Sequence, residues 1–241
     1  MQNSWSLSKP DNSQAHLAVA PATTGSFHPP PALNPPSILP PSILLQLDSA
    51  VDQIDLKAIF PTPQPVEVEL GSGDGSWLIE YARLHPERNF LGVERLFGRL
   101  RKIGRKGTRA GLRNLRGLRL EAGYCLEYLL PPQSVQALHI YFPDPWPKRR
   151  HWGRRLVGER FPSLASRVLV PGGVIYLRTD SSEYFAQMQA VLGGQAAFQP
   201  TETPPELAAI HTDFERDFLR QGISAFSAAF KTLNDGNKAP A

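Results

Sequence analysis

The chain has 241 residues, with 26 lysines and arginines against 22 aspartates and glutamates, so its formal charge is +4. Hydrophobic residues make up 41% and charged residues 20%, which is typical of a water-soluble protein with one well-buried domain. No apolar run approaches the roughly 18 residues of a membrane span, and one cysteine, Cys125, excludes an internal disulfide framework and any multi-thiolate metal site.

Residues 1–41 differ in composition from the rest of the chain. They contain nine prolines and only two charged side chains, Lys9 and Asp11. Such a segment cannot bury enough apolar surface to offset the entropy of ordering it, so we expect a disordered arm. It lacks the basic start and apolar stretch of a secretory signal and the arginines of a transit peptide. We therefore expect a cytoplasmic protein with one folded domain at 42–241.

The folded part alternates strand-like and helix-like segments. Apolar residues from about Ile43 to Phe60 have the spacing of one short amphipathic helix. Beyond three prolines, the pattern predicts five strands, at Val66–Leu70, Asn89–Glu94, Leu118–Glu121, Val135–Phe142 and Val174–Arg178. It predicts helices at Trp77–Leu84, Phe161–Val170 and Tyr184–Leu192. This alternation predicts βαβ units and a three-layer α/β domain, with a ligand crevice at the carboxyl ends of its strands.

A glycine loop lies where the first strand meets the first helix, in the run Glu69-Leu70-Gly71-Ser72-Gly73-Asp74-Gly75. The spacing is G-x-G-x-G after an acid, not the G-x-G-x-x-G of dinucleotide-binding proteins. An acid there suits a ligand with a positive group, such as S-adenosylmethionine, better than a pyrophosphate. Glu94 ends the next strand and could accept hydrogen bonds from ribose hydroxyls. The alternative is an ordinary turn flanked by solvated strand-end charges.

Basic residues are concentrated in two segments. Between Arg95 and Arg119 there are ten lysines or arginines and no acid. A second cluster is opposed only by Glu159, and it consists of Lys148, Arg149, Arg150, Arg154, Arg155 and Arg160. Clustered cations attract a polyanion, because each phosphate contact adds a salt-sensitive increment to affinity. The pattern favours nucleic acid as partner over an ordinary solvated surface.

A strand followed by a proline-stiffened loop is the most unusual segment, running from His139 to His151. Prolines reduce the number of conformations of the loop, so Asp144 is expected to be pre-positioned. Trp146 could stack on a base while Lys148 holds the adjacent backbone; alternatively, Trp146 is a core aromatic. Asp180 ends the fifth strand, and the run from Thr212 has the pattern of a capped helix start. No spacing of metal-ligating residues resembles a zinc site, so we expect no metal.

Together these segments resemble the bacterial tRNA (guanine-N7-)-methyltransferase family over about residues 43–232. The F-P-D-P-W-x-K stretch is highly specific, whereas many methyltransferases share the glycine loop. The matching segments are Glu69–Gly73, Phe90–Glu94, Phe142–His151, Arg154–Leu156, Thr179-Asp180 and Thr212–Glu215.

The resemblance implies methylation of guanine 46 in the variable loop of tRNA, with S-adenosylmethionine as donor. It implies a Rossmann-like αβα fold with a mostly parallel seven-stranded sheet, acting as a monomer or homodimer. Catalytic roles fall to Asp144 and Asp180. The donor site would comprise Glu69, Gly71, Gly73, Glu94, Tyr124 and Asp144. The tRNA site would comprise Lys148, Asp180, Thr212, Asp213, Phe214 and Glu215.

Two positions depart from the family pattern. The family usually has Gly-Asp-Ala after the third strand, with the aspartate near the adenine of the donor. The matching positions here are Gly123-Tyr124-Cys125, so either Tyr124 packs against the adenine or backbone groups replace the carboxylate. Asp213 stands where relatives commonly have lysine.

Two other functions stay open: methyl transfer to another RNA or to protein, and catalytically silent RNA binding. The glycine spacing disfavours a nicotinamide oxidoreductase.

Overall fold

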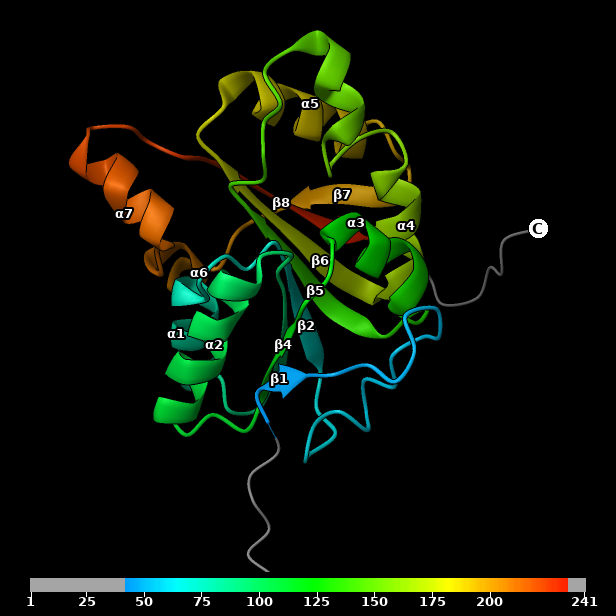
Figure 1. Cartoon of the computed structure of the whole chain (residues 1–241). Coiled ribbons are helices and arrows are strands. Elements are labelled where there is room, and N and C mark those ends of the chain that lie inside the picture. Colours follow the sequence, from blue (N-terminus) through cyan, green and yellow to red (C-terminus); the bar gives the residue numbers. More distant parts are fainter. Residues whose placement is uncertain (1–41, 234–241) are drawn as a thin grey trace, which may run out of the picture. The chain divides into compact units, whose positions relative to one another are not determined.

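The computed structural model describes residues 42–233, which form a single sheet with helices on both faces (Figure 1). The arm expected at 1–41 lies outside the described residues, as do 234–241. The sheet has eight strands in the order β1-β4-β3-β2-β5-β6-β8-β7. All neighbours run parallel except β6–β8 and β7–β8. The strands are β1 (Leu44–Leu45), β2 (Val66–Leu70), β3 (Asn89–Val93), β4 (Leu115–Leu118), β5 (Val135–Tyr141), β6 (Leu169–Thr179), β7 (Phe198–Thr201) and β8 (Phe226–Thr232).

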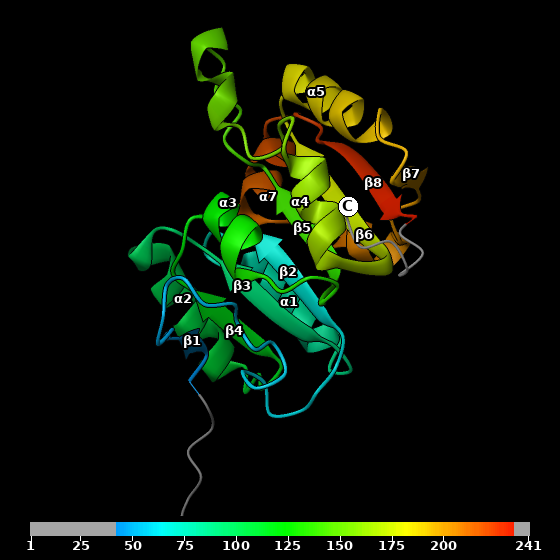
Figure 2. The ribbon, with the colours of Figure 1, turned by 90° about the vertical axis from the view of Figure 1, so that its right-hand side faces the viewer.

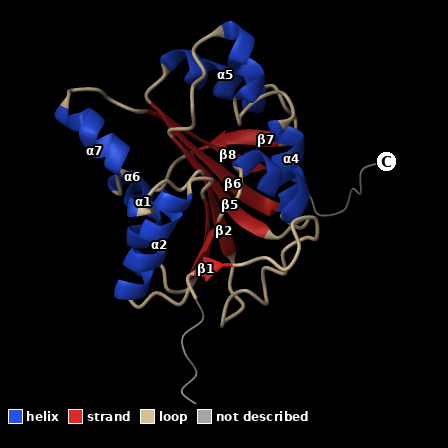
Figure 3. Ribbon diagram, viewed as in Figure 1, coloured by secondary structure: helices blue, strands red, loops and turns tan. Residues whose placement is uncertain are grey.

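Helices cover both faces of this sheet, as Figure 3 shows in blue and red. The chain contains α1 (Ser76–Leu84), α2 (Phe97–Arg109), α3 (Ala122–Tyr124), the π-helix η1 (Cys125–Leu129), the 3-10 helix η2 (Arg149–Arg154), α4 (Phe161–Val168), α5 (Ser182–Gly193), α6 (Pro205–Ala209) and α7 (Asp213–Arg220). A buried apolar cluster lies between each face of the sheet and the helices that cover it. On one, α1 and α2 contribute Trp77 and Ile103; on the other, η1, α4 and α5 contribute Leu126, Phe161 and Met188. The turned view in Figure 2 shows the same layering from the side.

Most predicted elements are confirmed, because their apolar positions do face these clusters. The strand at Val66–Leu70 is β2 residue for residue, and all five positions are buried on both faces, as expected for a central parallel strand. The strands expected from Asn89 and from Val135 each end one residue earlier than predicted. The sheet has one strand more than the seven expected, the two-residue β1 included.

Two predictions are wrong. The segment from Ile43 to Phe60 is no helix: after β1 it is irregular. Its apolar residues serve different faces, since Ile43 packs in the α1–α2 cluster and Phe60 in the opposite one, so the helical spacing is coincidental. The strand predicted at Leu118–Glu121 is β4 and ends at Leu118. The prediction missed the first residues of this strand because they include the charged Arg116. This arginine is nevertheless 2% exposed, and its Nε donates to the carbonyl of Ile59 at 2.7 Å.

The topology determines where a ligand can sit. β2 is central, and the chain builds outward from it through β3 and β4 on one side and through β5 and β6 on the other. In open α/β sheets, ligands bind at the carboxyl ends of the strands where this order reverses. Gly71, Glu94, Phe142 and Asp180 each directly follow one of these strands, so they meet at that edge.

Candidate active site

Two adjoining cavities lie at the carboxyl edge of the sheet. The β2–α7 pocket has a volume of about 360 Å³, and its lining includes Glu69, Ser72, Trp77, Asp180, Asp213 and Phe214. The β3–β4 pocket, of about 220 Å³, is lined by Glu94, Glu121, Ala122, Trp146 and Arg154, among others. The two share six residues, Gly71, Arg99, Tyr141, Phe142, Pro143 and Asp144. Together they form one bent site, divided by the loop that follows β5.

The glycine loop owes its shape to positive φ angles. Gly71, Gly73 and Gly75 have φ of 89°, 54° and 75°, a conformation that only glycine adopts without steric cost. The buried carboxylate of Glu94 holds this loop, accepting from Gly73 N at 3.0 Å and from Leu96 N at 2.6 Å. The acid at the end of β3 thus joins the loop to the start of α2, and it also faces the β3–β4 pocket.

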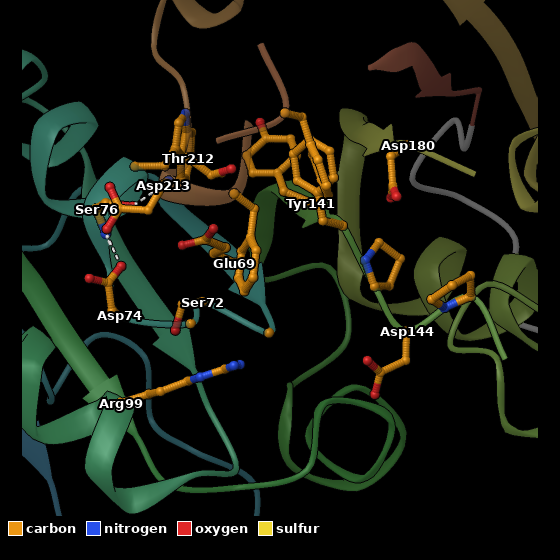
Figure 4. Close-up of a pocket in the computed structure, with 18 residues that line it drawn as sticks. Glu69, Ser72, Asp74, Ser76, Arg99, Tyr141, Asp144, Asp180, Thr212 and Asp213 are labelled. Carbon is orange, nitrogen blue, oxygen red and sulfur yellow. Dashed lines mark hydrogen bonds between the residues drawn. The ribbon is translucent and has the colours of Figure 1, made fainter. Parts of the chain in front are cut away.

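Glu69 is a buried acid without a full set of partners. It is 3% exposed, and its Oε2 has no hydrogen bond within the described residues. Burial raises the pKa of Glu69 well above its ordinary value; Arg178 opposes the shift, whereas Asp74 and Glu94 add to it. Trp77 Nε1 and Ser72 Oγ, also buried, lack partners as well. Figure 4 shows Glu69 and Ser72 among the residues that line this pocket. Glu69 therefore brings a carboxyl oxygen without a partner to the wall of this pocket.

The loop after β5 holds Asp144 on a strained backbone. Phe142 and Trp146, two residues to either side, have φ of 51° and 42°, which costs of order 1–3 kcal/mol each and persists only when the surroundings enforce it. Arg155 enforces it here: its Nε donates to the carbonyl of Pro145 at 2.7 Å, and it pairs with Glu183 of α5 at 3.1 Å. Asp144 is exposed and lines both pockets; that the loop pre-positions it stays a prediction.

Arg178 on β6 anchors α6 and α7 over the β2–α7 pocket. Its Nη1 donates to the carbonyl of Ile210 at 2.7 Å and to Glu215 Oε2 at 3.0 Å. Thr212 and Glu215 form the capping box of α7, which confirms the capped helix start that the sequence pattern indicated. Glu215 is thus occupied in the ion pair and lines neither pocket, whereas Thr212 and Asp213 line the β2–α7 pocket.

A buried polar chain lies beneath Tyr141. His139 places Nε2 2.7 Å from Glu67 Oε2 and Nδ1 2.8 Å from Tyr141 Oη. Although burial alone would raise it, the pKa of Glu67 lies below its ordinary value, because His139 and Arg88 stabilise the carboxylate; burial lowers the pKa of His139. Glu67 therefore accepts from Nε2–H, and the Tyr141 hydroxyl donates to Nδ1. The hydroxyl proton of Tyr141 is therefore directed to His139 and not into the pockets.

Besides Glu215, two further predicted residues, Tyr124 and Lys148, lie outside both pockets. The Tyr124 hydroxyl donates to the carbonyl of Ala50 at 2.9 Å and its ring packs on Tyr128, so it does not reach the expected adenine position. Lys148 is exposed at the start of η2. Glu121, which sequence reasoning missed, lines the β3–β4 pocket and caps α3 through Gly123 N at 2.9 Å. An acid just beyond a strand end would have indicated a site residue here. The strand was predicted to end three residues too late, so Glu121 was placed within the strand and overlooked.

Part of each basic cluster is structural. Arg116 and Arg155 are buried, Lys106 pairs with Asp74 at 2.6 Å and Arg160 pairs with Glu127. The remaining cations make no ion pair with an acid anywhere in residues 42–233. They are Arg95, Arg99, Arg101, Lys102, Arg105, Arg109, Arg113 and Arg119 of the first cluster, and Lys148, Arg149, Arg150 and Arg154 of the second.

Known proteins share this sequence over most of its length. The family model described as "Putative methyltransferase" matches residues 63–228. A tRNA (guanine-N(7)-)-methyltransferase of Halorhodospira halophila is 38% identical over 195 residues, 76% of this chain and 81% of that protein. One of Nitrosococcus oceani is 36% identical over 190 residues, 78% and 80% of the two chains. The chain belongs to the tRNA (guanine-N7-)-methyltransferase family. The resemblance seen in the motifs is thereby confirmed.

Solved structures agree on the fold of this family member. The 16S rRNA methyltransferase KamB matches with a TM-score of 0.52 at 20% identity, over 70% of this chain and 88% of that one. TrmN from Thermus thermophilus matches at 0.51 and 18% identity, over 71% of this chain and 45% of its own. The Rossmann-like methyltransferase fold is confirmed. Among residues 42–233, no three His, Cys, Asp or Glu side chains are grouped to hold a metal ion, and no helix has the length and apolarity to cross a membrane.

Proposed function

We propose that this chain transfers a methyl group from S-adenosylmethionine to N7 of guanine 46 in the variable loop of tRNA. The observation that carries the proposal is the pair of adjoining pockets, which share Tyr141 and Asp144 and differ in their acids. One pocket has the strand-end acids of a nucleoside site, and the other has room for a base beside Asp144 and Asp180. Membership of the tRNA (guanine-N7-)-methyltransferase family supports the type of reaction and tRNA as the substrate.

The donor fits across both pockets. Glu94 and Glu121 follow adjacent strands and face the β3–β4 pocket, where acids at such strand ends hold ribose and base. Glu69 has a free carboxylate oxygen in the other pocket, suited to the ammonium of the methionyl end. When bound, the donor supplies an electrophilic methyl on a sulfonium. The chain's part is to fix that methyl at the junction of the pockets, beside Asp144.

No residue needs to act as a general base. Guanine N7 is an unprotonated acceptor on the major-groove edge, so its lone pair can attack without prior loss of a proton. Consistent with this, the Tyr141 hydroxyl proton is directed to His139. Rate enhancement then comes from holding N7, methyl carbon and sulfur in line, which is catalysis by proximity.

The placement of the acids decides whether they help or hinder. Positive charge leaves sulfur and appears on the purine, so a carboxylate beside sulfur alone would stabilise the ground state more than the transition state. Asp144 and Asp180 lie beyond the donor's acids, both exposed to the pocket (Figure 4). There they would accept from guanine N1–H and its amino group and stabilise the cationic product.

The rest of the chain takes simpler roles in this proposal. Lys148 and the other exposed cations of η2 would hold RNA phosphates beside the pocket. Residues 1–41 would be a tether that turnover does not need, which the turnover of a chain lacking them tests. We propose that the protein works in the cytoplasm, as a monomer or homodimer and without a metal.

The direct test incubates purified protein with tritiated S-adenosylmethionine and unmodified tRNA, followed by digestion to nucleosides. Label in 7-methylguanosine is the expected result, and loss of this label with tRNA that carries adenine at position 46 would place it there. Label in another nucleoside would mean a different RNA target. Absence of label, together with donor binding by calorimetry and tRNA binding by filter retention, would mean that the chain binds RNA without methylating it.

A further inference from the structure

The charged side chains on the exposed face of α2 are all cations. Arg101, Arg105 and Arg109 follow one another at four-residue spacing, which places them in a row along one side of the helix. Lys102 lies beside this row, and Arg99 leads from it to the pocket. The opposite side of the helix is apolar or glycine: its buried residues are Leu100, Ile103, Gly104 and Gly107. From Arg101 to Arg109 the row extends about 12 Å at 1.5 Å per residue.

These cations are not engaged within the protein. None of the three row arginines has an ion pair among residues 42–233, and the guanidinium of Arg101 lies 5.9 Å from the Phe97 ring. Uncompensated like charges at i and i+4 repel one another and destabilise a helix. A row of this kind therefore costs stability unless an anionic partner covers it.

The row also forms one wall of a third cavity, of about 580 Å³, whose other wall is Ser42, Ile43 and Leu44. Residues 1–41, which precede this wall, carry a single acid, Asp11, and so cannot match a row of three cations. An occupant with regularly spaced negative charges must come from outside.

Arg99, two residues before the row on α2, links the row to the active site. Arg99 lines both pockets, and Figure 4 shows its side chain extending from α2 into them. Arg154 of η2, which belongs to the second basic cluster, also lines the β3–β4 pocket, as Arg99 does. An RNA strand that places a base beside Asp180 therefore leaves the pocket next to α2.

We propose that the α2 row, Arg101, Arg105 and Arg109, is a second tRNA contact that binds backbone phosphates outside the catalytic pockets. This inference rests on the proposed function, since tRNA is the polyanion that the reaction brings to this edge. The row contributes to affinity and not to chemistry, because none of its three residues lines either catalytic pocket. Each phosphate contact lowers the slope of log K against log salt by about 0.7–0.9.

The test compares the full chain with the triple variant Arg101→Gln/Arg105→Gln/Arg109→Gln. Glutamine keeps helix propensity close to that of arginine, and a melting curve checks folding. The matched control removes three exposed cations elsewhere, Lys57→Gln/Arg83→Gln/Lys231→Gln. We expect the row variant to bind tRNA at least about tenfold more weakly at 50 mM KCl and to lose about 2–3 from its salt slope. Its kcat at saturating tRNA and its donor affinity should equal those of the wild type.

The outcomes separate the possibilities. A wild-type KM and salt slope in the row variant would overturn the proposal, as would an equal loss in the control. The variant Arg101→Lys/Arg105→Lys/Arg109→Lys should retain the slope; if it loses as much as the glutamine variant, packing and not charge is responsible. A change in sedimentation with an unchanged salt slope would instead identify a second copy of the chain as the partner. Failure of the proposed function is distinct, since the wild type would then not methylate tRNA at all.

Discussion

Glu69→Gln should make the free protein more stable and should weaken its binding of the donor. Folding transfers this side chain from water to a site that is 3% exposed, with one oxygen unpartnered. Because burial raises its pKa above the ordinary 4.5, the folded state favours the protonated acid. At a pH above both the unfolded and the folded pKa, each unit of difference costs about 1.4 kcal/mol of stability. Glutamine has the same shape and carries no charge to bury.

The pH dependence of this effect has a definite sign. With the folded pKa raised, the stability that Glu69 contributes is fully present below the unfolded pKa and is lost as pH rises through the folded pKa. The melting temperature of Glu69→Gln should therefore exceed that of the wild type by a margin that grows from pH 4.5 upward. The scale is about 2–4 °C per kcal/mol for a chain of this size.

Donor binding should change in the opposite direction. An ammonium–carboxylate contact at 4 Å amounts to about 4 kcal/mol at an effective dielectric of 20, before desolvation, and a net value of about 1.5–3 kcal/mol is usual for a hydrogen bond to a charged group. Calorimetry with S-adenosylhomocysteine, which keeps the ammonium, should show about 10- to 150-fold weaker binding. Glu202→Gln, the same change at an exposed site, is the control. Unchanged affinity together with a pH-independent melting difference would refute the reasoning about Glu69.

Three further variants test neighbouring parts of the site. Glu121→Ala should weaken binding of S-adenosylhomocysteine by calorimetry, whereas Tyr124→Phe, which removes only the hydroxyl bonded to Ala50, should not; the reverse order would restore Tyr124 as the adenine contact. Asp180→Ala should lower kcat in tRNA methylation far more than it weakens donor binding, and unchanged turnover would reject its role at the guanine. Thr212→Ala removes the cap of α7 and should cost about 0.5–2 kcal/mol in chemical denaturation while raising KM for tRNA; an unchanged KM would show that α7 does not position the substrate.

The sequence alone located the crevice because its signals are local. A G-x-G-x-G turn after an acid, and acids or prolines directly after apolar strands, fix which residues stand at the carboxyl edge. Glu69, Glu94, Asp144 and Asp180 are all found there. The roles of these residues toward donor and guanine remain predictions, since geometry alone does not assign them.

What the sequence missed depends on long-range contacts. Arg116 can lie within a buried strand because the carbonyl of Ile59, 57 positions away, accepts a hydrogen bond from its Nε. The sequence does not show this contact, so the end of β4 was predicted too late and Glu121 was missed. Glu215 could be either a substrate ligand or a capping residue until Arg178, 37 positions away, is seen to pair with it. Similarly, only the fold separates the cations that brace the protein, such as Arg155, from those that face outward.

A crystal structure of the protein with S-adenosylhomocysteine tests the central claim most directly. The account predicts ribose hydroxyls on the Glu94 carboxylate, the ammonium on Glu69, and the sulfur at the junction beside Tyr141 and Asp144. A donor product bound elsewhere, or one whose sulfur faces away from Asp144 and Asp180, would contradict it.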